Sequence, residues 1–495
     1  MRYLSTRGQE AVSAAQAILN GLSPDGGLYV PEYIPEAPAD WLDPACGFTY
    51  QELAAAVLNL YFPELGEETL KAMCREAYES FAAPEVTPLS QLDGDTWLLE
   101  LYHGPTLAFK DVALQLLPRL IVRAARLTGE KRIIHILTAT SGDTGKAALE
   151  GFRDVDGTAC TVFYPHGGVS DLQYRQMATS LGRNVQVVAV RGNFDDAQTG
   201  VKRLFSDPAF RAELDEAGRL PSSANSINIG RLIPQIVYYF YGYRVLRQTN
   251  RLQAGEKMDI CVPTGNFGDI LAAWYAKRMG LPVGRMICAS NRNRVLTDFF
   301  ETGVYNTDRP FHKTISPSMD ILISSNLERL LFELCGRDAE TVRAWMASLR
   351  ETGRFALQET QLKVLQSEFA AGTADDVQTR AAIRSTFERC GALTDPHTAV
   401  GLSVLEELRE KDGESRVTLV NATASPYKFV SDVSEALGLS VTGRVFDDAR
   451  SLSAHTGTAL PAQISALETM EIRHKTVSDP EQMGKAVLAF AEKET

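Results

Sequence analysis

The chain has 495 residues, of which 44% are hydrophobic and 23% are charged, so we expect two or three domains of a globular protein. Acidic residues outnumber basic residues by 62 to 50, which gives a formal net charge of −12. No basic surplus is available to displace counterions from phosphates, and this composition excludes nucleic acid as a general partner.

The sequence has no pattern that indicates a membrane segment or a metal site. The N-terminal stretch MRYLSTRGQEAVSAAQ has no apolar signal core, and no apolar run approaches the length that spans a membrane. The seven cysteines include no CxxC pair, and the seven histidines form no HExxH grouping. Dispersed cysteines are typical of free thiols in a reducing compartment. We therefore expect a cytoplasmic protein without a metal centre.

The first 95 residues differ from the rest of the chain in their pattern of turn residues and hydrophobic residues. They contain the turn-rich stretch GLSPDGGLYVPEYIPEAP, followed by two segments with helical periodicity, TYQELAAAVLNLYF and TLKAMCREAYESF. From about Trp97, short β-rich runs alternate with helical patterns, which predicts an α/β fold with parallel sheets. Residues 293–393 are mainly helical and more charged, and we interpret them as a helical insertion.

Several strand–turn–helix units can be recognised along the α/β part. RIIHILTAT leads through SGDTG into KAALEGF, and MDICVPT leads through GNFGD into ILAAWYAKRMG. SRVTLVNATASP leads into YKFVSDVSEAL near the C-terminus. Ligands of open parallel sheets bind beyond the carboxyl ends of the strands. The candidate functional residues are therefore those of the turns.

The Gly145-Lys146 pair after the first of these strands raises the possibility of a nucleotide-binding P-loop. That motif requires a glycine five residues before the second one and a hydroxyl residue after the lysine. This chain has Thr140 and Ala147 at those positions. The P-loop interpretation fails at both defining positions.

The turn SGDTG itself offers hydroxyls and free backbone amides at a helix start, which suit a small anion such as a carboxylate. The hydroxyls are those of Ser141 and Thr144. An equally good alternative at this point is that Asp143 or Thr144 only caps the helix.

The turn PTGNFGD carries two glycines, Gly265 and Gly268, where a ligand can approach the backbone. A phosphate on the N-terminus of the following helix is physically reasonable. Asp269 offers the alternative of a simple helix cap.

Lys110 in HGPTLAFKDVALQLL stands in an apolar setting beside Phe109. Partial removal from water lowers the pKa of a lysine and makes it a usable amine nucleophile for a carbonyl group. The alternative is a surface lysine paired with Asp111, and for an isolated FKD sequence that alternative is the better one.

Seven motifs, in this order, resemble threonine synthases: STRG, LSPDGGLYVP, LYHGPTLAFKD, TATSGDTG, NSINIGRLIPQ, PTGNFGD and NATASPYKF. These are pyridoxal-phosphate enzymes of the tryptophan-synthase-β fold type, and the bacterial and fungal form has a separate N-terminal domain. The resemblance implies two parallel-sheet α/β domains besides that N-terminal domain and the helical insertion. We expect residues 1–95 to form the N-terminal domain, 96–120 and 200–495 the large cofactor-binding domain, and 121–199 the small domain.

The resemblance also implies roles for individual residues. Lys110 would hold pyridoxal 5'-phosphate as a Schiff base and serve as the acid–base group. The remaining cofactor-binding residues would be the pyridine partner Thr423, the ring neighbour Asp143 and the phosphate loop, which comprises Gly265, Asn266, Phe267, Gly268 and Asp269. Substrate-binding residues would be Ser141, Gly142, Thr144, Asn225, Ser226 and Arg231.

The implied activity is the conversion of O-phospho-L-homoserine and water to L-threonine and phosphate, the last step of threonine biosynthesis. This substrate has a carboxylate and a phosphate at opposite ends, so its site needs two anion receptors. The turn at 141–145 and the Asn/Ser/Arg cluster at 225–231 supply them, and the arginine fork suits a phosphate. The family includes monomers and homodimers.

Asp143 departs from the pattern of many relatives, which have an asparagine that donates to the 3'-oxygen of the cofactor. A carboxylate there would face a like charge. We hypothesise that Asp143 is protonated or is turned away to cap the helix; alternatively, the 3'-oxygen keeps a proton and donates it to Asp143.

Rival interpretations come from three classes. Serine/threonine dehydratases of the same fold type generally have TGSFKxRGA around the lysine and a tetraglycine phosphate loop, whereas this chain has PTLAFKDVALQ and PTGNFGD. Phospho-lyases related to threonine synthase share more of the motifs, and a product assay separates them. A P-loop kinase fails as described, and a non-catalytic scaffold protein would not bind the cofactor covalently.

Overall fold

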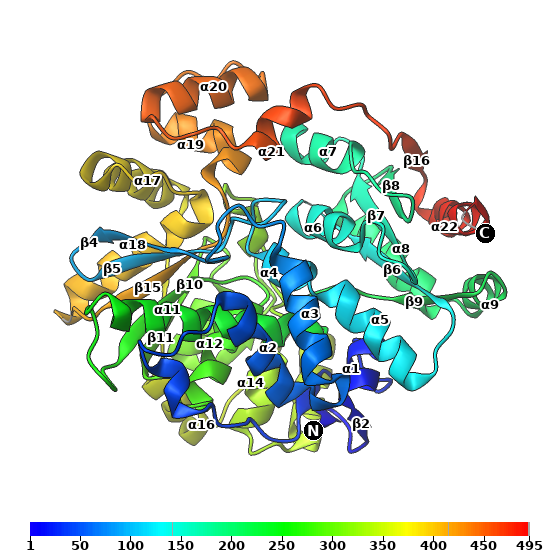
Figure 1. Ribbon diagram of the computed structural model, residues 1–495, viewed down its shortest axis with the longest axis horizontal. Coiled ribbons are helices and arrows are strands. Elements are labelled where there is room, and N and C mark those ends of the chain that lie inside the picture. The colour runs from blue at the N-terminus through cyan, green and yellow to red at the C-terminus, as the bar shows by residue number, and fades with distance from the viewer. Residues whose placement is uncertain (141, 414, 494–495) are drawn as a thin grey trace.

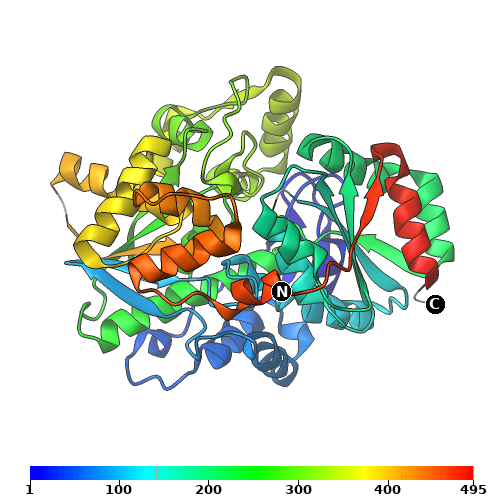
Figure 2. The same cartoon turned by 90° about the horizontal axis from the view of Figure 1, so that it is seen from above.

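The computed structural model describes residues 1–140, 142–413 and 415–493, and it arranges most of them in two lobes, each built on a sheet. Seen from above, the lobes lie side by side, and the C-terminus is on the smaller one (Figure 2). Within the described residues the larger sheet has six strands, in the order β14-β11-β10-β15-β5-β4, and only β4 is antiparallel. Its strands are β4 (Leu89–Asp93), β5 (Thr96–Glu100), β10 (Met258–Pro263), β11 (Val283–Ser290), β14 (Phe369–Thr373) and β15 (Thr418–Ala422).

The smaller sheet has five parallel strands over the same described ranges, in the order β16-β8-β7-β6-β9. They are β6 (Ile133–Ala139), β7 (Thr158–Pro165), β8 (Val185–Val190), β9 (Arg219–Ser222) and β16 (Thr476–Ser478). Every residue of β7 is buried, as expected for a strand covered on both faces by helices. The two parallel-sheet domains predicted from the sequence are confirmed.

Helices connect the strands and cover the sheets (Figure 1). Those around the smaller sheet are α5 (Leu117–Thr128), α6 (Asp143–Phe152), α7 (Asp171–Ala178), α8 (Phe194–Ser206), α9 (Pro208–Glu216) and α22 (Met483–Lys493). Those of the larger lobe include α4 (Lys110–Leu114), α10 (Ile229–Leu232), α11 (Ile236–Gln248), α12 (Gly268–Arg278), α18 (Pro396–Asp412), α19 (Val430–Ala436), α20 (Val445–Thr456) and α21 (Ala462–Ser465).

The N-terminal unit has a small antiparallel sheet of its own, with the strands β1 (Arg2–Ser5), β2 (Ala11–Ser13) and β3 (Tyr29–Pro31). The helices α1 (Ala14–Asn20), α2 (Tyr50–Tyr61) and α3 (Glu67–Tyr78) complete it. It shares one continuous hydrophobic core with the larger lobe. Residues 89–93, at the end of the range expected for this unit, form β4 of the larger sheet instead.

Two strands in the range expected for the large domain, 200–495, belong to the smaller sheet. β9 pairs with β6, and β16 pairs with β8. The chain therefore returns from the larger lobe after α21, adds an edge strand to the smaller sheet and ends in α22. Arg175 of α7 fastens this returning segment by donating to the backbone carbonyls of Leu467, Glu468 and Met470.

Residues 293–393 are mainly helical, with α13 (Val295–Thr302), α14 (Leu327–Leu334), α15 (Ala339–Thr352), α16 (Glu359–Glu368) and α17 (Asp376–Cys390). The region is not only an insertion, because it also contributes β14 to the edge of the larger sheet. Its β12 (Val304–Asn306) and β13 (Arg354–Ala356) pair with each other.

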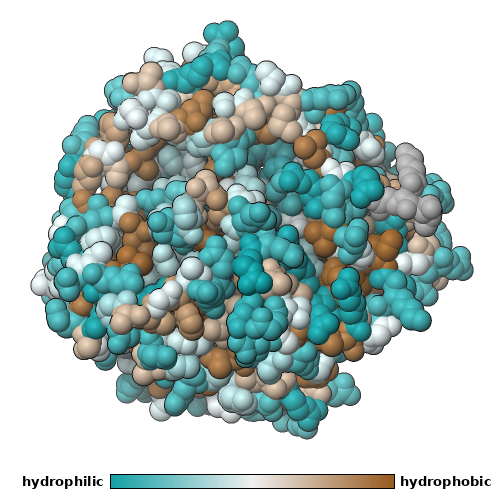
Figure 3. Space-filling view, viewed as in Figure 1, coloured by the Kyte–Doolittle hydropathy of each residue, from teal (hydrophilic) through white to brown (hydrophobic). Residues whose placement is uncertain are grey.

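Hydrophobic residues on the face shown in Figure 3 are scattered among hydrophilic ones. No helix in the described part of the chain is long and apolar enough to cross a membrane. Three or more potential metal-ligating side chains do not come together anywhere in those same ranges.

Candidate active site

The predicted site residues lie beyond the carboxyl ends of neighbouring strands. In the larger sheet, β5, β15 and β10 are adjacent, and they lead to Lys110, Thr423 and the loop 265–269 respectively. In the smaller sheet, β6 and β9 are adjacent, and they lead to Asp143 and to the 225–231 cluster. This edge is where ligands bind in such folds. The topology thus gathers into one region groups that are far apart in the sequence.

Lys110 begins α4, and the loop before it is bonded to the segment that contains Thr423. The amide of Phe109 donates to the carbonyl of Thr423 at 2.8 Å, and the amide of Ser425 donates to the carbonyl of Leu107 at 3.0 Å. Asp111 does not pair with Lys110 at the surface, as the alternative interpretation required. It is buried and accepts from the amide and the hydroxyl of Thr106, at 2.8 and 2.6 Å.

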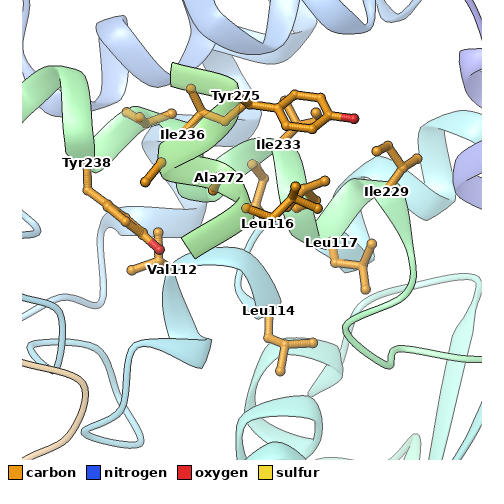
Figure 4. Packing of buried hydrophobic residues seen from close by; sticks show 14 of the residues in the cluster. Val112, Leu114, Leu116, Leu117, Ile229, Ile233, Ile236, Tyr238, Ala272 and Tyr275 are labelled. Carbon is orange, nitrogen blue, oxygen red and sulfur yellow. The ribbon is translucent and has the colours of Figure 1, made fainter. Parts of the chain in front are cut away.

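A hydrophobic core beneath Lys110 fixes the helix that carries it. Val112, Leu116 and Leu117 belong to one cluster of buried hydrophobic residues with Ile233 and Ala272 (Figure 4). The helix α10 contacts both α4 and α12. Side chains in a close-packed core have little freedom to shift, so Lys110, Arg231 and the loop before α12 are held in a defined mutual arrangement.

The amine of Lys110 is set up as a nucleophile. Lys110 is partly exposed, and its Nζ lies 4.5 Å from the centre of the Phe109 ring. Burial, opposed by the attraction of Asp143 and aided by the repulsion of Arg231, lowers the pKa of this amine from 10.5 to about 8. A substantial fraction of the amine is therefore neutral near physiological pH, as attack on a carbonyl requires.

The loop 265–268 has the features of an anion cradle. A side chain at Gly265 would meet the carbonyl oxygen of Ser318 at 2.5 Å, and Phe267 adopts a left-handed conformation with φ of 64°. The hydroxyl of Ser324 and the side-chain amide of Asn326 hold the carbonyls of Gly265 and Asn266, at 2.7 and 3.0 Å. The first-turn amides of α12 then point outward without partners within the helix.

Asp269 keeps its carboxylate out of this cradle. It accepts hydrogen bonds from the hydroxyls of Tyr238 and Tyr239 and from the side-chain amide of Asn421. Burial raises the pKa of Asp269. It makes no helix-capping bond, since the residue before α12 is Phe267 without a side-chain cap, so the simple-cap alternative is wrong. Only the backbone of Asp269 remains available to a phosphate.

Thr140, which the sequence interpretation did not select as a site residue, holds the turn after β6 together. The hydroxyl of Thr140 accepts from the amides of Gly142 and Gly145, at 3.0 and 3.1 Å. Neither Asp143 nor Thr144 caps α6, which leaves the Thr144 hydroxyl for other contacts. Ser141 lies outside the described residues.

Asp143 is buried and faces Lys428, with 2.9 Å between its Oδ1 and the lysine Nζ. Burial would raise the pKa of Asp143, but the fields of Lys428 and Lys110 lower it to about 2. Our two hypotheses that Asp143 is protonated or turned away as a cap are therefore both wrong, because a cation supplied from a distant part of the chain keeps it ionised.

Arg231 is a buried cation, 3% exposed. One Nη donates to the carbonyl of Ala224 at 3.0 Å, while its Nε is buried without any partner. Burial lowers the pKa of Arg231 to about 10. Among the described residues no carboxylate lies within ion-pair distance of it, so the surface ion pair that was its alternative is excluded. A buried guanidinium next to Lys110 with an unpartnered Nε is suited to an anionic ligand.

The other two residues of this cluster are more accessible to solvent than Arg231. Asn225 is exposed, and its side-chain oxygen accepts from the hydroxyl of Thr138 in β6 at 3.2 Å. This bond joins the ends of the adjacent strands β6 and β9. Ser226 is partly exposed.

Sequence reasoning missed several residues that support the site. Lys428 stands in the quoted motif NATASPYKF, and its signal, a lysine beside a phenylalanine in an apolar run, is the same one that identified Lys110. His397 had no signal. Its Nδ1 is 2.6 Å from an Asp395 oxygen, and its Nε2 accepts from the amide of Ser318 at 3.1 Å. It thereby supports the segment that packs against Gly265.

The residues present fit pyridoxal phosphate. A partly desolvated lysine amine, a glycine-bearing loop at a helix N-terminus and the buried hydroxyl residue Thr423 lie at the ends of three neighbouring strands. The side chain of Asp269, the acidic residue of the phosphate loop, is bonded to Tyr239. Its carboxylate therefore does not face the place of the cofactor phosphate.

Comparison with known protein families gives three matches that cover most of the chain. Residues 2–78 match the model described as threonine synthase N terminus, residues 82–360 that of the pyridoxal-phosphate dependent enzymes, and residues 398–487 that of the threonine synthase C-terminal region.

Among curated proteins, the threonine synthase of Pseudomonas aeruginosa is 42% identical over 88% of this chain and 90% of its own length. That of Saccharomyces cerevisiae is 37% identical over 88% of this chain and 89% of its own. Human threonine synthase-like 1 is 39% identical over 87% of this chain, which spans only 59% of that longer protein.

Solved structures of threonine synthases are also similar to this chain. The pyridoxal-phosphate-bound threonine synthase of Brucella melitensis superposes with a TM-score of 0.88 at 40% identity, covering 99% of both chains. The yeast threonine synthase gives a TM-score of 0.89 at 34% identity, covering 100% of this chain and 99% of its own.

Proposed function

Since the chain belongs to the threonine synthase family, we propose that its candidate site converts O-phospho-L-homoserine and water to L-threonine and phosphate with the residues described above. The chain is a pyridoxal-phosphate-dependent lyase of that family. The proposal includes a cytoplasmic protein that acts as a monomer or homodimer. The observation that supports this substrate best is Arg231, a buried guanidinium next to Lys110 with an orphan donor and no carboxylate partner in the described ranges.

The cofactor would be held by Lys110, by the backbone of residues 265–269 and by Thr423. A threonine hydroxyl is a neutral partner for the pyridine nitrogen, whereas an aspartate would keep it protonated. When bound, pyridoxal phosphate supplies an electron sink for the bonds at the substrate Cα.

Lys110 performs the proton transfers in this proposal. Once displaced by the substrate amine, its free amine takes the proton from Cα and serves again at Cβ and Cγ, and a pKa near 8 suits both roles at physiological pH. Phosphate leaves from Cγ into the field of Arg231, and water adds at Cβ. One mobile lysine can serve several steps because all three carbons lie on one short chain.

The two anionic ends of the substrate would be received by two separate groups of residues near Lys110. The first-turn amides of α6 with Thr144, together with Gly142 and Ser141, receive the carboxylate. Arg231 receives the phosphate, together with Asn225 and Ser226. Arginine suits a phosphate because its fork donates parallel hydrogen bonds.

A product assay tests this proposal. Purified protein with pyridoxal phosphate and O-phosphohomoserine should release threonine and phosphate in equal amounts, and Lys110→Ala should release neither. Formation of 2-oxobutyrate without threonine would instead identify a phospho-lyase related to threonine synthase. Absence of any cofactor binding would identify a non-catalytic protein that keeps the fold.

A further inference from the structure

The candidate site contains a second buried lysine, Lys428, whose surroundings differ from those of Lys110. Three acceptors surround the Nζ of Lys428: the carbonyl of Thr106 at 2.7 Å, the Oδ1 of Asp143 at 2.9 Å and the side-chain oxygen of Gln176 at 3.4 Å. The contacts with Thr106 and Gln176 are hydrogen bonds, and the contact with Asp143 is an ion pair. Its side chain is 1% exposed.

Lys110 has no comparable set of partners. No described hydrogen-bond acceptor or carboxylate is bound to its Nζ, which instead lies over the Phe109 ring. The two lysines therefore differ in the availability of their amines. Lys110 has a free amine, whereas Lys428 is held by two hydrogen bonds and an ion pair.

The partners of Lys428 come from both lobes. Lys428 itself and Thr106 belong to the larger lobe, and Thr106 immediately precedes the turn that leads to Lys110. Asp143 in α6 and Gln176 in α7 belong to the smaller lobe. The ammonium group therefore joins the two lobes at the candidate site, and it determines where the Asp143 carboxylate lies relative to Lys110.

A carboxylate at position 143 needs such a partner. Removing an ion from water costs several kcal/mol unless an opposite charge and hydrogen bonds compensate it. The charged and titratable groups that act on Asp143 are Lys428, Lys110 and His397. Of these, Lys110 would be bonded to the cofactor, and Nε2 of His397 accepts from the amide of Ser318. Among the described residues, Lys428 is then the one basic side chain within ion-pair distance of Asp143.

We propose that Lys428 is a positioning residue that acts through Asp143: it holds this side chain as a carboxylate and fixes it at the ring edge of the bound cofactor. The Asp143–Lys428 pair has no net charge, so it presents the cofactor with the same total charge as a neutral side chain would. The inference relies on the proposed cofactor site and goes beyond it by assigning a role to a residue that does not react.

Charge-changing variants test the proposal, with two readouts taken without substrate. One readout is the equilibrium affinity of the apoprotein for pyridoxal phosphate, and the other is the pH dependence of the absorbance of the bound cofactor. Lys428→Gln leaves the carboxylate uncompensated, and Asp143→Asn leaves the ammonium uncompensated. Each should lower the affinity by at least about tenfold and shift the absorbance titration.

The double variant D143N/K428Q is the decisive one, because it restores a neutral pair. It should bind the cofactor within about threefold of the wild type, since the charge that each single variant leaves unpaired is gone. Lys428→Arg keeps the charge and should retain the wild-type absorbance titration.

A matched control is Asp259→Asn. Asp259 is another buried carboxylate, paired with Arg285, at the start of β10 and therefore at the opposite edge of the larger sheet. This variant should lower the unfolding temperature while both cofactor readouts stay at wild-type values.

Two results would overturn the proposal. One is strictly additive losses of affinity in the double variant. The other is a Lys428→Gln protein that unfolds at a lower temperature but keeps the wild-type affinity and absorbance titration, which is what a purely structural ion pair would give. Neither readout involves O-phosphohomoserine, so a failure to form threonine would leave this test unaffected.

Discussion

At the scale of single residues, the site is organised by where charges are compensated and where they are not. Lys110 and Arg231 are cations whose pKa values are lowered by burial, and both face the region where ligands bind. Asp143 and Asp269 are anions with fixed partners, Lys428 for the first and two tyrosines for the second. The uncompensated groups are those that we assign to ligands, which is the usual relation between perturbed groups and functional sites.

The first prediction concerns Arg231→Met. Because the buried guanidinium has no carboxylate partner to lose, we expect the unfolding temperature to stay the same or to rise. The KM for O-phosphohomoserine should increase by about 10- to 100-fold, as expected for the loss of charge-assisted hydrogen bonds. Initial rates over a range of substrate concentrations and thermal unfolding provide the two measurements.

Arg244→Met is the matched control for this prediction. Arg244 is also buried, donates to the carbonyl of Phe48 and has orphan donors, but it lies in α11 against the N-terminal unit. Its loss should leave the KM unchanged. An unchanged KM in Arg231→Met would remove the phosphate role from Arg231.

The second prediction concerns the pH dependence of cofactor uptake. The neutral amine of Lys110 is the nucleophile, and its fraction rises as the pH increases through its pKa of about 8. The rate at which apoprotein takes up pyridoxal phosphate should therefore rise with pH and level off above about 8. Stopped-flow absorbance measurements over a pH series would show this. A rate that still rises at the ordinary pKa of lysine, 10.5, would contradict the lowered value.

At the scale of elements, local motifs predicted the strand–turn–helix units and the loops that carry the site. Lys110, the 265–269 loop and Thr423 lie at the ends of adjacent strands because parallel topology brings carboxyl ends to one edge. The side-chain partners could not be predicted in the same way. Nothing near Asp143 in the sequence indicates Lys428, and a helix cap at Asp143 or Asp269 is as good a local interpretation until Thr140, Tyr238 and Asn421 are placed in space.

The third prediction compares two alanine substitutions in the loop before α12. Gly265→Ala would press a methyl group against the carbonyl oxygen of Ser318, so it should destabilise the apoprotein by about 1–3 kcal/mol. Gly268→Ala meets nothing closer than the side-chain amide of Asn326 at 3.6 Å, so the stability of the apoprotein should not fall.

Cofactor binding distinguishes a clash within the protein from a clash with the ligand. If the phosphate approaches the backbone of this loop, Gly268→Ala should weaken pyridoxal phosphate binding on the order of tenfold despite an intact fold. Wild-type affinity in that variant would move the phosphate to another place. Equilibrium titration and denaturant unfolding supply both quantities.

At the scale of the whole molecule, the N-terminal unit supports the site through α14. Arg329 is fully buried, and its Nε donates to the carbonyl of Tyr29 at 2.9 Å while one Nη donates to the carbonyl of Ile227 at 2.6 Å. It also donates to Asn326, whose amide in turn holds the carbonyl of Asn266 in the phosphate loop. One guanidinium thus connects the N-terminal sheet with the 225–231 cluster and the 265–269 loop.

The arrangement of whole segments was only partly accessible from the sequence. The alternation of strands and helices predicted two parallel sheets, but β16 has three residues and no periodicity to identify it as an edge strand of the smaller sheet. Its place depends on the long return of the chain after α21 and on Arg175. Such contacts between distant segments exist only in the folded chain, so the local sequence could not predict them.

The fourth prediction uses a pair of arginines that hold the same strand, β3. Arg337 donates to the carbonyls of Pro31 and Glu32 and pairs with Glu333, but it reaches no segment of the site. Arg329→Met and Arg337→Met should both lower the unfolding temperature. Only Arg329→Met should also weaken cofactor binding and raise the KM, because only Arg329 holds Ile227 and Asn326. Equal effects on the KM would show that the N-terminal unit contributes stability alone.

The most direct test of the account is to identify the lysine that binds the cofactor. The protein is incubated with pyridoxal phosphate and reduced with borohydride, and the labelled peptide is located by mass spectrometry. We predict that the label lies on Lys110, whose amine is free, and that Lys428, which is buried and paired with Asp143, is unmodified. A label on Lys428 or on any other lysine would contradict the assignment of the site.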